Sequence, residues 1–288
     1  MFWPLLSLGC VDVGSGAADS GAEIGQHRWV ELSISARSIC AMSNLGFVYC
    51  IGDVYSSLDG VGWSDIDATF AVQCGIRETE MQCSGDSFDY VDLEVIPFRL
   101  SMNDGGGRGC AWAESGEVEC FGHDIFGEGN PPGGLRASEV SSGSYFSCAI
   151  DFGRELSCWG QLSEAPPTGR DWEELACSVA DCCAIRSSGE LECWGGNYEK
   201  VHDSPDGEFV RLGGGEGTFC ALESSGTVRC WGNLAPDVPE GLPLLVDVDV
   251  SRRDRTVCGI TLEDTVVCFG NDDFGGAGFP SAAEVTAL

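Results

Sequence analysis

The sequence predicts an all-β protein built from seven copies of one cysteine-bridged hairpin. Cysteine pairs recur along the chain, and their first members are spaced 34 to 38 residues apart, a period typical of repeat architectures. Within each copy, apolar and polar residues alternate with period two, which indicates strands. A turn signal in the middle of most copies separates two such strands. The repeated pairs are Cys40 with Cys50, Cys74 with Cys83, Cys110 with Cys120, Cys148 with Cys158, Cys183 with Cys193, Cys220 with Cys230 and Cys258 with Cys268.

The third copy shows how one hairpin is expected to fold. With Cys110 opposite Cys120, the loop is 114–116, Glu-Ser-Gly, and its glycine suits a left-handed backbone conformation. Copy two is one residue shorter and has no glycine, so the pattern leaves its turn open. In the other copies, the residues expected at the left-handed position are Gly46, Gly153, Gly189, Gly226 and Asp264.

This register predicts seven disulfides inside the hairpins, because directly opposed residues of an antiparallel pair bring their Cβ atoms close together. Each disulfide is expected to contribute about 2–4 kcal/mol. The nine residues inside most of these pairs fit a hairpin better than a zinc site, which favours cysteines two to four residues apart. Cys177 and Cys182 remain inside copy five and can pair locally, which leaves Cys10 alone.

A short strand-like segment precedes each hairpin, with an apolar residue eight positions before the first cysteine. Examples are the segments 29–32 and 209–212. These apolar residues are Leu32, Ile66, Met102, Val140, Leu175, Leu212 and Val250.

Composition limits the compartment and the class of partner. A chain of 288 residues with 43% hydrophobic residues can bury a sizeable core, and the unbroken repeat predicts one closed domain over 27–288. Paired cysteines point to an oxidising compartment outside the cytosol. The net charge is −31 and Lys200 is the single lysine, so we do not expect nucleic-acid binding.

The N-terminal residues resemble part of a bacterial lipoprotein signal. An apolar segment, 1–9, ends in Leu-Gly before Cys10, and a polar segment rich in small residues, 10–26, predicts a flexible tether. We expect lipidation of Cys10 and export to the bacterial cell envelope or the extracellular space. The alternative is an ordinary signal remnant that leaves Cys10 free or paired between molecules. No segment has the length of a transmembrane helix, so membrane contact is expected only through the lipid.

Copy six, Cys-Ala-Leu-Glu-Ser-Ser-Gly-Thr-Val-Arg-Cys-Trp-Gly-Asn over 220–233, resembles the regulator of chromosome condensation repeat. The loop signatures over 124–129 and 273–278 carry the same resemblance, which covers 28–288. It implies a seven-bladed β-propeller and a broad superfamily that includes a secreted β-lactamase-inhibitor propeller. Nucleotide exchange and chromatin contact, known for nuclear members, are not expected of an acidic, disulfide-rich exported chain. Residues 284–286 resemble a leading strand, and we expect them to complete a shared blade while 29–32 packs nearby.

Function is less constrained than fold. The three histidines, His27, His123 and His202, lack metal-ligand companions at characteristic spacing, so we expect no catalytic set, metal or cofactor, although the sequence leaves a weak calcium site open. We predict a monomeric, non-enzymatic module that binds a protein or a glycan through the loops after the hairpins. The candidate binding residues are Tyr55, Phe88, Tyr90, His123, Phe126, Tyr198 and Phe274.

The sequence leaves three alternatives open. Phe126 and Phe274 can pack between blades instead of binding a ligand. The chain can be a hydrolase or lyase with acidic residues at a central channel, an idea supported by acidic composition alone. It can also be a purely structural surface protein.

Overall fold

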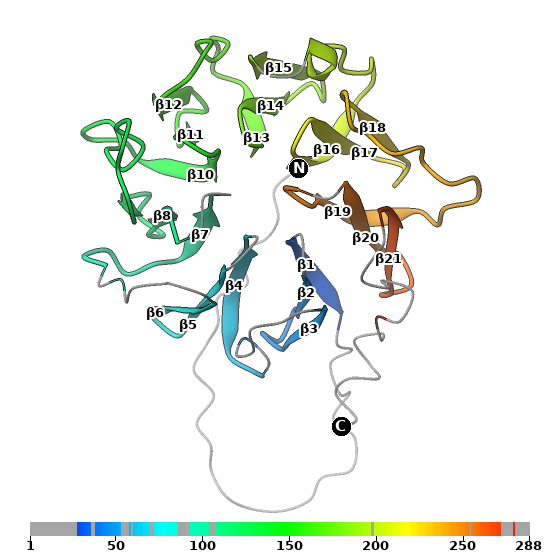
Figure 1. Ribbon diagram of the computed structural model, residues 1–288, viewed down its shortest axis with the longest axis horizontal. Helices are drawn as coiled ribbons and strands as arrows, with labels where there is room; N and C mark the ends of the chain where they lie inside the picture. The colour runs from blue at the N-terminus through cyan, green and yellow to red at the C-terminus, as the bar shows by residue number, and fades with distance from the viewer. Residues whose placement is uncertain are drawn as a thin grey trace, which may run out of the picture.

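The computed structural model shows seven three-stranded antiparallel sheets arranged as blades in a ring (Figure 1). It describes residues 28–35, 38–52, 58, 60–69, 72–85, 91, 93–103, 107–196, 199–253, 255–271 and 279. Each blade contains three consecutive strands, and its first strand lies nearest the centre of the ring. The predicted seven-bladed β-propeller is confirmed.

Each blade has an inner, a middle and an outer strand. The inner strands are β1 (Trp29–Ile34), β4 (Trp63–Ala68), β7 (Arg99–Met102), β10 (Ala137–Ser142), β13 (Trp172–Cys177), β16 (Phe209–Gly215) and β19 (Leu245–Val250). The middle strands are β2 (Ser38–Ser43), β5 (Val72–Arg77), β8 (Gly109–Trp112), β11 (Phe146–Asp151), β14 (Asp181–Arg186), β17 (Thr218–Glu223) and β20 (Thr256–Thr261). The outer strands are β3 (Val48–Gly52), β6 (Glu80–Gly85), β9 (Val118–Phe121), β12 (Leu156–Gly160), β15 (Leu191–Gly195), β18 (Val228–Trp231) and β21 (Val266–Gly270). A 3-10 turn, η1 (Glu199–Val201), follows β15.

The disulfides follow the predicted register. In each of the seven hairpins, the two cysteines lie directly opposite each other on the middle and outer strands. Cys177 and Cys182 also lie opposite each other, where the inner and middle strands of blade 5 meet. All eight expected disulfides are therefore present.

The two cysteines of a hairpin differ in burial. The first cysteine, on the middle strand, is buried in every blade because it faces the cluster shared with the next blade. The second cysteine, on the outer strand, is half-buried in every blade. The bonded partners of the buried first cysteines are Cys50, Cys83, Cys120, Cys158, Cys193, Cys230 and Cys268.

The hydrophobic core is divided into seven clusters, one between each pair of neighbouring blades. Because side chains alternate along a strand, each middle strand presents apolar residues to the blade on either side. Ring closure uses the same packing, since Ile260 of blade 7 lies in one cluster with Trp29 and Leu32 of blade 1. Small residues such as Ala41 and Ala221 are fully buried where neighbouring blades meet.

Hairpin turns also join neighbouring blades through their backbone. The left-handed conformation of Gly46, φ 71°, points its carbonyl oxygen at the next blade, where it accepts the Trp63 N–H at 3.0 Å. Gly116, Gly189 and Gly226 make equivalent contacts. The repeated turn glycine therefore stabilises the ring as well as its own hairpin.

The structure corrects the predicted turn of copy four. Arg154, not Gly153, has the left-handed conformation (φ 62°), and its carbonyl accepts the Trp172 N–H. The glycine lies one residue before the position that faces the next blade. In copy two, Glu78 adopts φ 59° in a two-residue turn closed by the pair Arg77 and Glu80.

Two further expectations about the leading strands were wrong. Met102 and Val250 are not the counterparts of Leu32, because the inner turns of blades 3 and 7 are two residues longer; Leu100 and Val248 take that place. The N-terminal strand does not pack beside a blade but pairs with β2 as the inner strand of blade 1. Residues 284–286 lie outside the described residues, so their predicted role in closure stays a prediction.

Candidate binding surface

Strand direction gives the ring two distinct faces. Inner strands begin, and middle-to-outer hairpin turns project, on one face, which we call the hairpin-turn face. Inner-to-middle turns and the loops that start after the outer strands lie on the opposite face, which we call the loop face. The candidate binding residues from the sequence belong to loops that leave from the loop face.

Two of the seven predicted candidates are described, and both lie on the loop face. His123 is exposed and follows Gly122 directly. Phe126 is 47% exposed and its ring contacts Tyr145 of the next blade edge-on, with centroids 5.2 Å apart. Phe126 therefore has both expected features, since it packs between blades and remains accessible. Tyr55, Phe88, Tyr90, Tyr198 and Phe274 lie outside the described residues, and so does the lipidation candidate Cys10.

A buried ion pair supports this part of the loop face. Arg108 and Glu128 are buried and their side chains are 3.0 Å apart. Glu128 also accepts the Phe126 N–H through its carboxylate and the Trp159 indole N–H through its carbonyl. The loop after β9 is thereby fixed to blades 3 and 4, which favours a structural role for its sequence signature.

Charged residues line the centre of the ring, one at the same position of each inner strand. This position holds five carboxylates and two guanidinium groups: Glu31, Asp65, Arg99, Glu139, Glu174, Arg211 and Asp247. Asp67 and Asp249 lie two residues further along β4 and β19. The sequence did not locate this cluster, because its members are more than 30 residues apart and resemble ordinary strand surface residues.

The channel carboxylates accept backbone hydrogen bonds from the next blade. Asp65 accepts the Leu100 N–H at 2.6 Å, and Asp67 accepts the Met102 N–H at 2.7 Å. Glu31, Glu139 and Glu174 make the same kind of contact. Asp249 closes the ring by accepting the Ile34 N–H of blade 1 at 2.9 Å.

Burial raises the pKa of these carboxyls. The pKa of Asp65 rises to about 6, and those of Asp247 and Asp249 rise to about 7. Burial also raises the pKa of Glu31 and Glu139 well above the ordinary glutamate value, with repulsion from Asp65 and Glu174 respectively adding to it. The lining therefore holds protons at a pH where exposed carboxyls have lost them.

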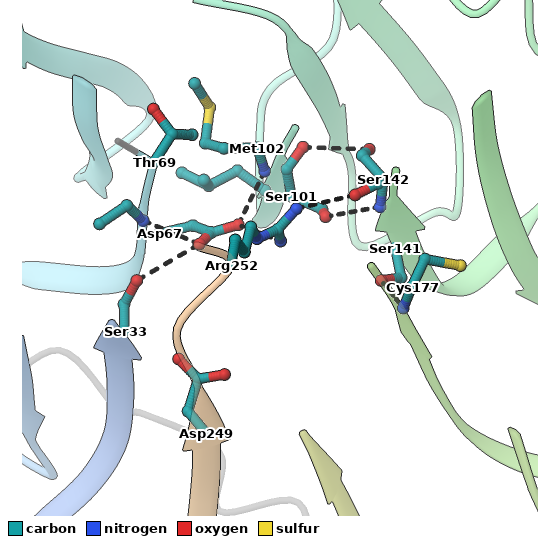
Figure 2. A network of polar contacts seen from close by, with 12 residues as sticks. Ser33, Asp67, Thr69, Ser101, Met102, Ser141, Ser142, Cys177, Asp249 and Arg252 are labelled. Atoms are coloured by element: carbon teal, nitrogen blue, oxygen red, sulfur yellow. Dashed lines mark hydrogen bonds and ion pairs between the residues drawn. The ribbon is translucent and has the colours of Figure 1, made fainter. Parts of the chain in front are cut away.

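Arg252 lies beside these carboxylates, two residues after the inner strand of blade 7. Figure 2 shows its guanidinium between Asp67 of blade 2 and Ser142 of blade 4. It donates to the Ser142 carbonyl at 2.8 Å and lies 3.6 Å from the Asp67 carboxylate. One side chain thus links three blades and adds positive charge where Asp67 and Asp249 approach each other.

The hairpin-turn face, which the sequence did not single out, carries most of the exposed apolar side chains in the described part of the chain. They occupy hairpin turns, β-bulges at the start of inner strands, or the residues just before those strands. They are Val30, Leu45, Val61, Ile96, Phe98, Phe152, Val210, Leu244, Val246 and Leu262. The overlooked signal is an apolar residue in turns where other copies have serine or glutamate, as at Leu45, Phe152 and Leu262.

Five of these residues form what we call the closure patch, where blades 7 and 1 meet: Val30, Leu45, Leu244, Val246 and Leu262. Val30 follows Trp29, which pairs with Ser43 at the start of the turn that holds Leu45. Val246 follows Leu245, which pairs with Thr261, the residue before Leu262. The two blades are joined here by Arg28. Its guanidinium lies 3.8 Å from Asp264, and its backbone N–H donates to the Asn44 side chain. A backbone hydrogen bond from Leu262 to Leu244 continues the surface.

The described residues offer little for metal chemistry. Among the described residues, one group of three possible ligand side chains has its ligand atoms within 4.8 Å of one another: Cys148, Cys177 and Cys182. All three are in disulfides. No described helix is long and apolar enough to cross a membrane.

No family model matches the chain, and no curated protein matches it. Solved structures do resemble it. The ectodomain of the Physcomitrella patens receptor kinase CR4 superposes with a TM-score of 0.70 at 20% identity, covering 85% of this chain and 74% of that one. The CRINKLY WD40 ectodomain of the Arabidopsis thaliana receptor kinase ACR4 gives 0.62 at 22% identity, covering 76% and 84%.

Prp20p from Saccharomyces cerevisiae, a protein described with its binding to Gsp1p and histones, gives a TM-score of 0.62 at 12% identity over 78% of this chain and 80% of that one. The fold is that of a β-propeller. At these identities the likeness establishes the fold alone.

Proposed function

We propose that this chain is an exported, non-enzymatic propeller that binds a protein through its hairpin-turn face. The observation that carries the proposal is the closure patch, where Leu45, Leu244 and Leu262 are 55%, 46% and 65% exposed. Contiguous exposed apolar residues on a soluble domain mark interaction sites. Aliphatic side chains favour the apolar part of a protein partner over a glycan.

The charges of the hairpin-turn face as a whole indicate the chemistry of the partner. Six exposed or half-exposed arginines on the hairpin-turn face are in ion pairs with acidic residues: Arg28, Arg136, Arg154, Arg170, Arg186 and Arg229. Exposed glutamates such as Glu78, Glu114 and Glu263 add negative charge in the hairpin turns. A partner with an apolar contact flanked by basic side chains fits this surface best.

The channel geometry favours this proposal over the hydrolase or lyase alternative. Most of the carboxylates at the centre of the ring accept backbone N–H groups of the next blade, and Arg252 links Asp67 to the Ser142 carbonyl. Those contacts give the acidic residues a structural task. His123 and His202 lie in exposed loops rather than beside the channel carboxylates on the inner strands.

The setting we propose is the bacterial cell envelope. Eight disulfides suit an oxidising compartment. The lipoprotein-like sequence around Cys10 supports attachment through a lipid. Intact mass of the native protein before and after reduction tests this: loss of residues 1–9 with a diacylglyceryl group on Cys10 is expected, and a full-length unmodified chain would contradict it.

The binding proposal is tested by cross-linking in the native host with three proteins: wild type, Leu45→Asp with Leu262→Asp, and a control. The control, Ile125→Asp, changes a residue that is 63% exposed on the loop face. We expect the double variant to recover at least tenfold less of one basic protein that the control still captures. A tenfold decrease corresponds to a loss of about 1.4 kcal/mol of binding free energy. Equal recovery by all three proteins would exclude the closure patch as the binding surface.

A further inference from the structure

Blade 5 has one disulfide more than the other described blades. This additional disulfide contacts the hairpin disulfide of blade 4. Cys182 and Cys183 are neighbours on β14, so their side chains point to opposite faces of the blade. Cys183 faces blade 6 and pairs with Cys193. Cys182 faces blade 4, pairs with Cys177, and lies in the cluster shared by blades 4 and 5.

The hairpin disulfide of blade 4 belongs to the same cluster. The Sγ atoms of Cys148 and Cys182 are 3.8 Å apart, although each is bonded to another sulfur. The sulfurs of Cys148, Cys177 and Cys182 all lie within 4.8 Å of one another. The two disulfides are therefore in van der Waals contact across a blade boundary.

The neighbouring boundary, between blades 3 and 4, provides a direct comparison. Ser147 has the place in blade 4 that Cys182 has in blade 5, because each lies one residue before the first cysteine of its hairpin. Its hydroxyl is 3.6 Å from the Cys110 sulfur. Between blades 3 and 4, this position therefore places a hydroxyl against the hairpin disulfide. Between blades 4 and 5, it places a second disulfide there.

Access to the two disulfides is graded. Cys148, Cys177 and Cys182 are buried, whereas Cys158 is half-buried at the outer strand β12. An external thiol therefore reaches the Cys158 sulfur before any of the other three.

We propose that Cys158, Cys148, Cys182 and Cys177 form a thiol–disulfide exchange site that accepts a small thiol or the thiolate of an oxidoreductase. The external thiolate attacks the Cys158 sulfur, forms a mixed disulfide with it, and expels the Cys148 thiolate. That thiolate, 3.8 Å from the Cys182 sulfur and no longer held by Cys158, rotates into line with the Cys182–Cys177 bond. It then forms a Cys148–Cys182 bond and expels the Cys177 thiolate, which takes up a proton.

Two disulfide bonds break and two form. The external thiol is oxidised into the mixed disulfide while Cys177 is reduced to a thiol, so the chain and the external thiol together undergo no net oxidation or reduction. Two bonds within blades are replaced by one bond between blades and one mixed disulfide at the surface. Burial disfavours the thiolate form of Cys148, so the second step is slow and is promoted by alkaline pH. The product links blade 4 covalently to blade 5.

The second step is tested in the full-length chain by freeing one thiol. In a Cys10→Ser background, Cys158→Ser frees Cys148, and the matched control Cys120→Ser frees Cys110, which faces Ser147. Each folded protein is held at pH 8.5 without added thiol, quenched with acid, alkylated and mapped by peptide mass spectrometry. We expect most of the label of the Cys158→Ser protein on Cys177, together with a peptide linked through Cys148 and Cys182. The control is expected to keep its label on Cys110.

Label that stays on Cys148 while Cys177–Cys182 remains intact would overturn the exchange step. Label spread over cysteines of other blades would also overturn it, since that result shows general scrambling. The first step is tested on wild-type protein with reduced glutathione, where the proposal requires glutathione on Cys158 and the Cys148–Cys182 link in the same molecules. Glutathione on Cys158 in molecules that keep the Cys177–Cys182 bond, or on Cys148, Cys177 or Cys182 before Cys158, would refute it.

Discussion

Replacing Asp249 by asparagine tests whether the channel holds a proton in the folded protein near neutral pH. The Asp249 carboxyl accepts the Ile34 N–H through one oxygen and the Val250 N–H through the other. Burial, together with repulsion from Asp67, raises its pKa to about 7, although its backbone contacts and Arg252 oppose the shift. Asparagine preserves the size of the side chain and removes its titration.

The sign and size of the effect follow from proton linkage. The unfolded chain releases the Asp249 proton near pH 3.9, whereas the folded chain keeps it until about pH 7, so raising the pH through this window favours unfolding. One retained proton changes the free energy of unfolding by about 1.4 kcal/mol per pH unit. Between pH 5 and pH 7, this carboxyl should therefore lower wild-type stability by about 2 kcal/mol. The Asp65 and Asp247 carboxyls act in the same direction.

The assay is urea unfolding at pH 5 and pH 7 with the disulfides intact. The free energy of unfolding should fall from pH 5 to pH 7, and this fall should be about 2 kcal/mol smaller for Asp249→Asn than for wild type. Stability that the variant loses through its altered hydrogen bonds is lost at both pH values and does not affect this comparison. Glu78→Gln, at an exposed turn residue, removes the same formal charge and should leave the pH dependence close to that of wild type. Identical pH dependence in wild type and Asp249→Asn would refute the reasoning.

Two other substitutions test contacts that hold the blades together. Gly46→Ala forces a side chain into a left-handed turn, 2.4 Å from the Trp63 carbonyl oxygen, and should lower the free energy of unfolding by about 1–3 kcal/mol in thermal unfolding. Gly153 lacks that conformation, so Gly153→Ala should cost much less. Equal losses would contradict the role given to the turn. Arg108→Met removes one member of the buried ion pair with Glu128 and should lower the free energy of unfolding in urea by about 3–5 kcal/mol. A decrease below about 1 kcal/mol would show that the pair is dispensable.

The hairpins, their register and all eight disulfides could be predicted from the sequence because their contacts are local. Cys110 and Cys120 are separated by ten residues, and period-two alternation determines which side chains share a face. The errors concerned small shifts of the same kind. Arg154 replaced Gly153 at a turn, and longer inner turns displaced Met102 and Val250 by two residues. A fixed offset from a cysteine does not account for such changes in turn length.

Less of the candidate binding surface could be predicted from the sequence. Loop aromatics can be recognised in the sequence, and Phe126 is both accessible and packed against Tyr145 as expected. The closure patch was missed because no stretch of sequence contains it. Its members Val30 and Leu262 come from opposite ends of the chain and lie on neighbouring blades because blade 7 packs against blade 1.

The sequence by itself determined seven disulfide-linked hairpins, since each depends on residues close in the chain. Only the tertiary structure decided what gathers at the axis and at the boundaries between blades. Asp249 lies 215 residues from the Ile34 N–H that it accepts, and Cys148 lies 34 residues from the Cys182 sulfur that it contacts. Closing the ring brings such residues together, because each inner strand presents its residues at the same position to a common axis and each blade packs against the next.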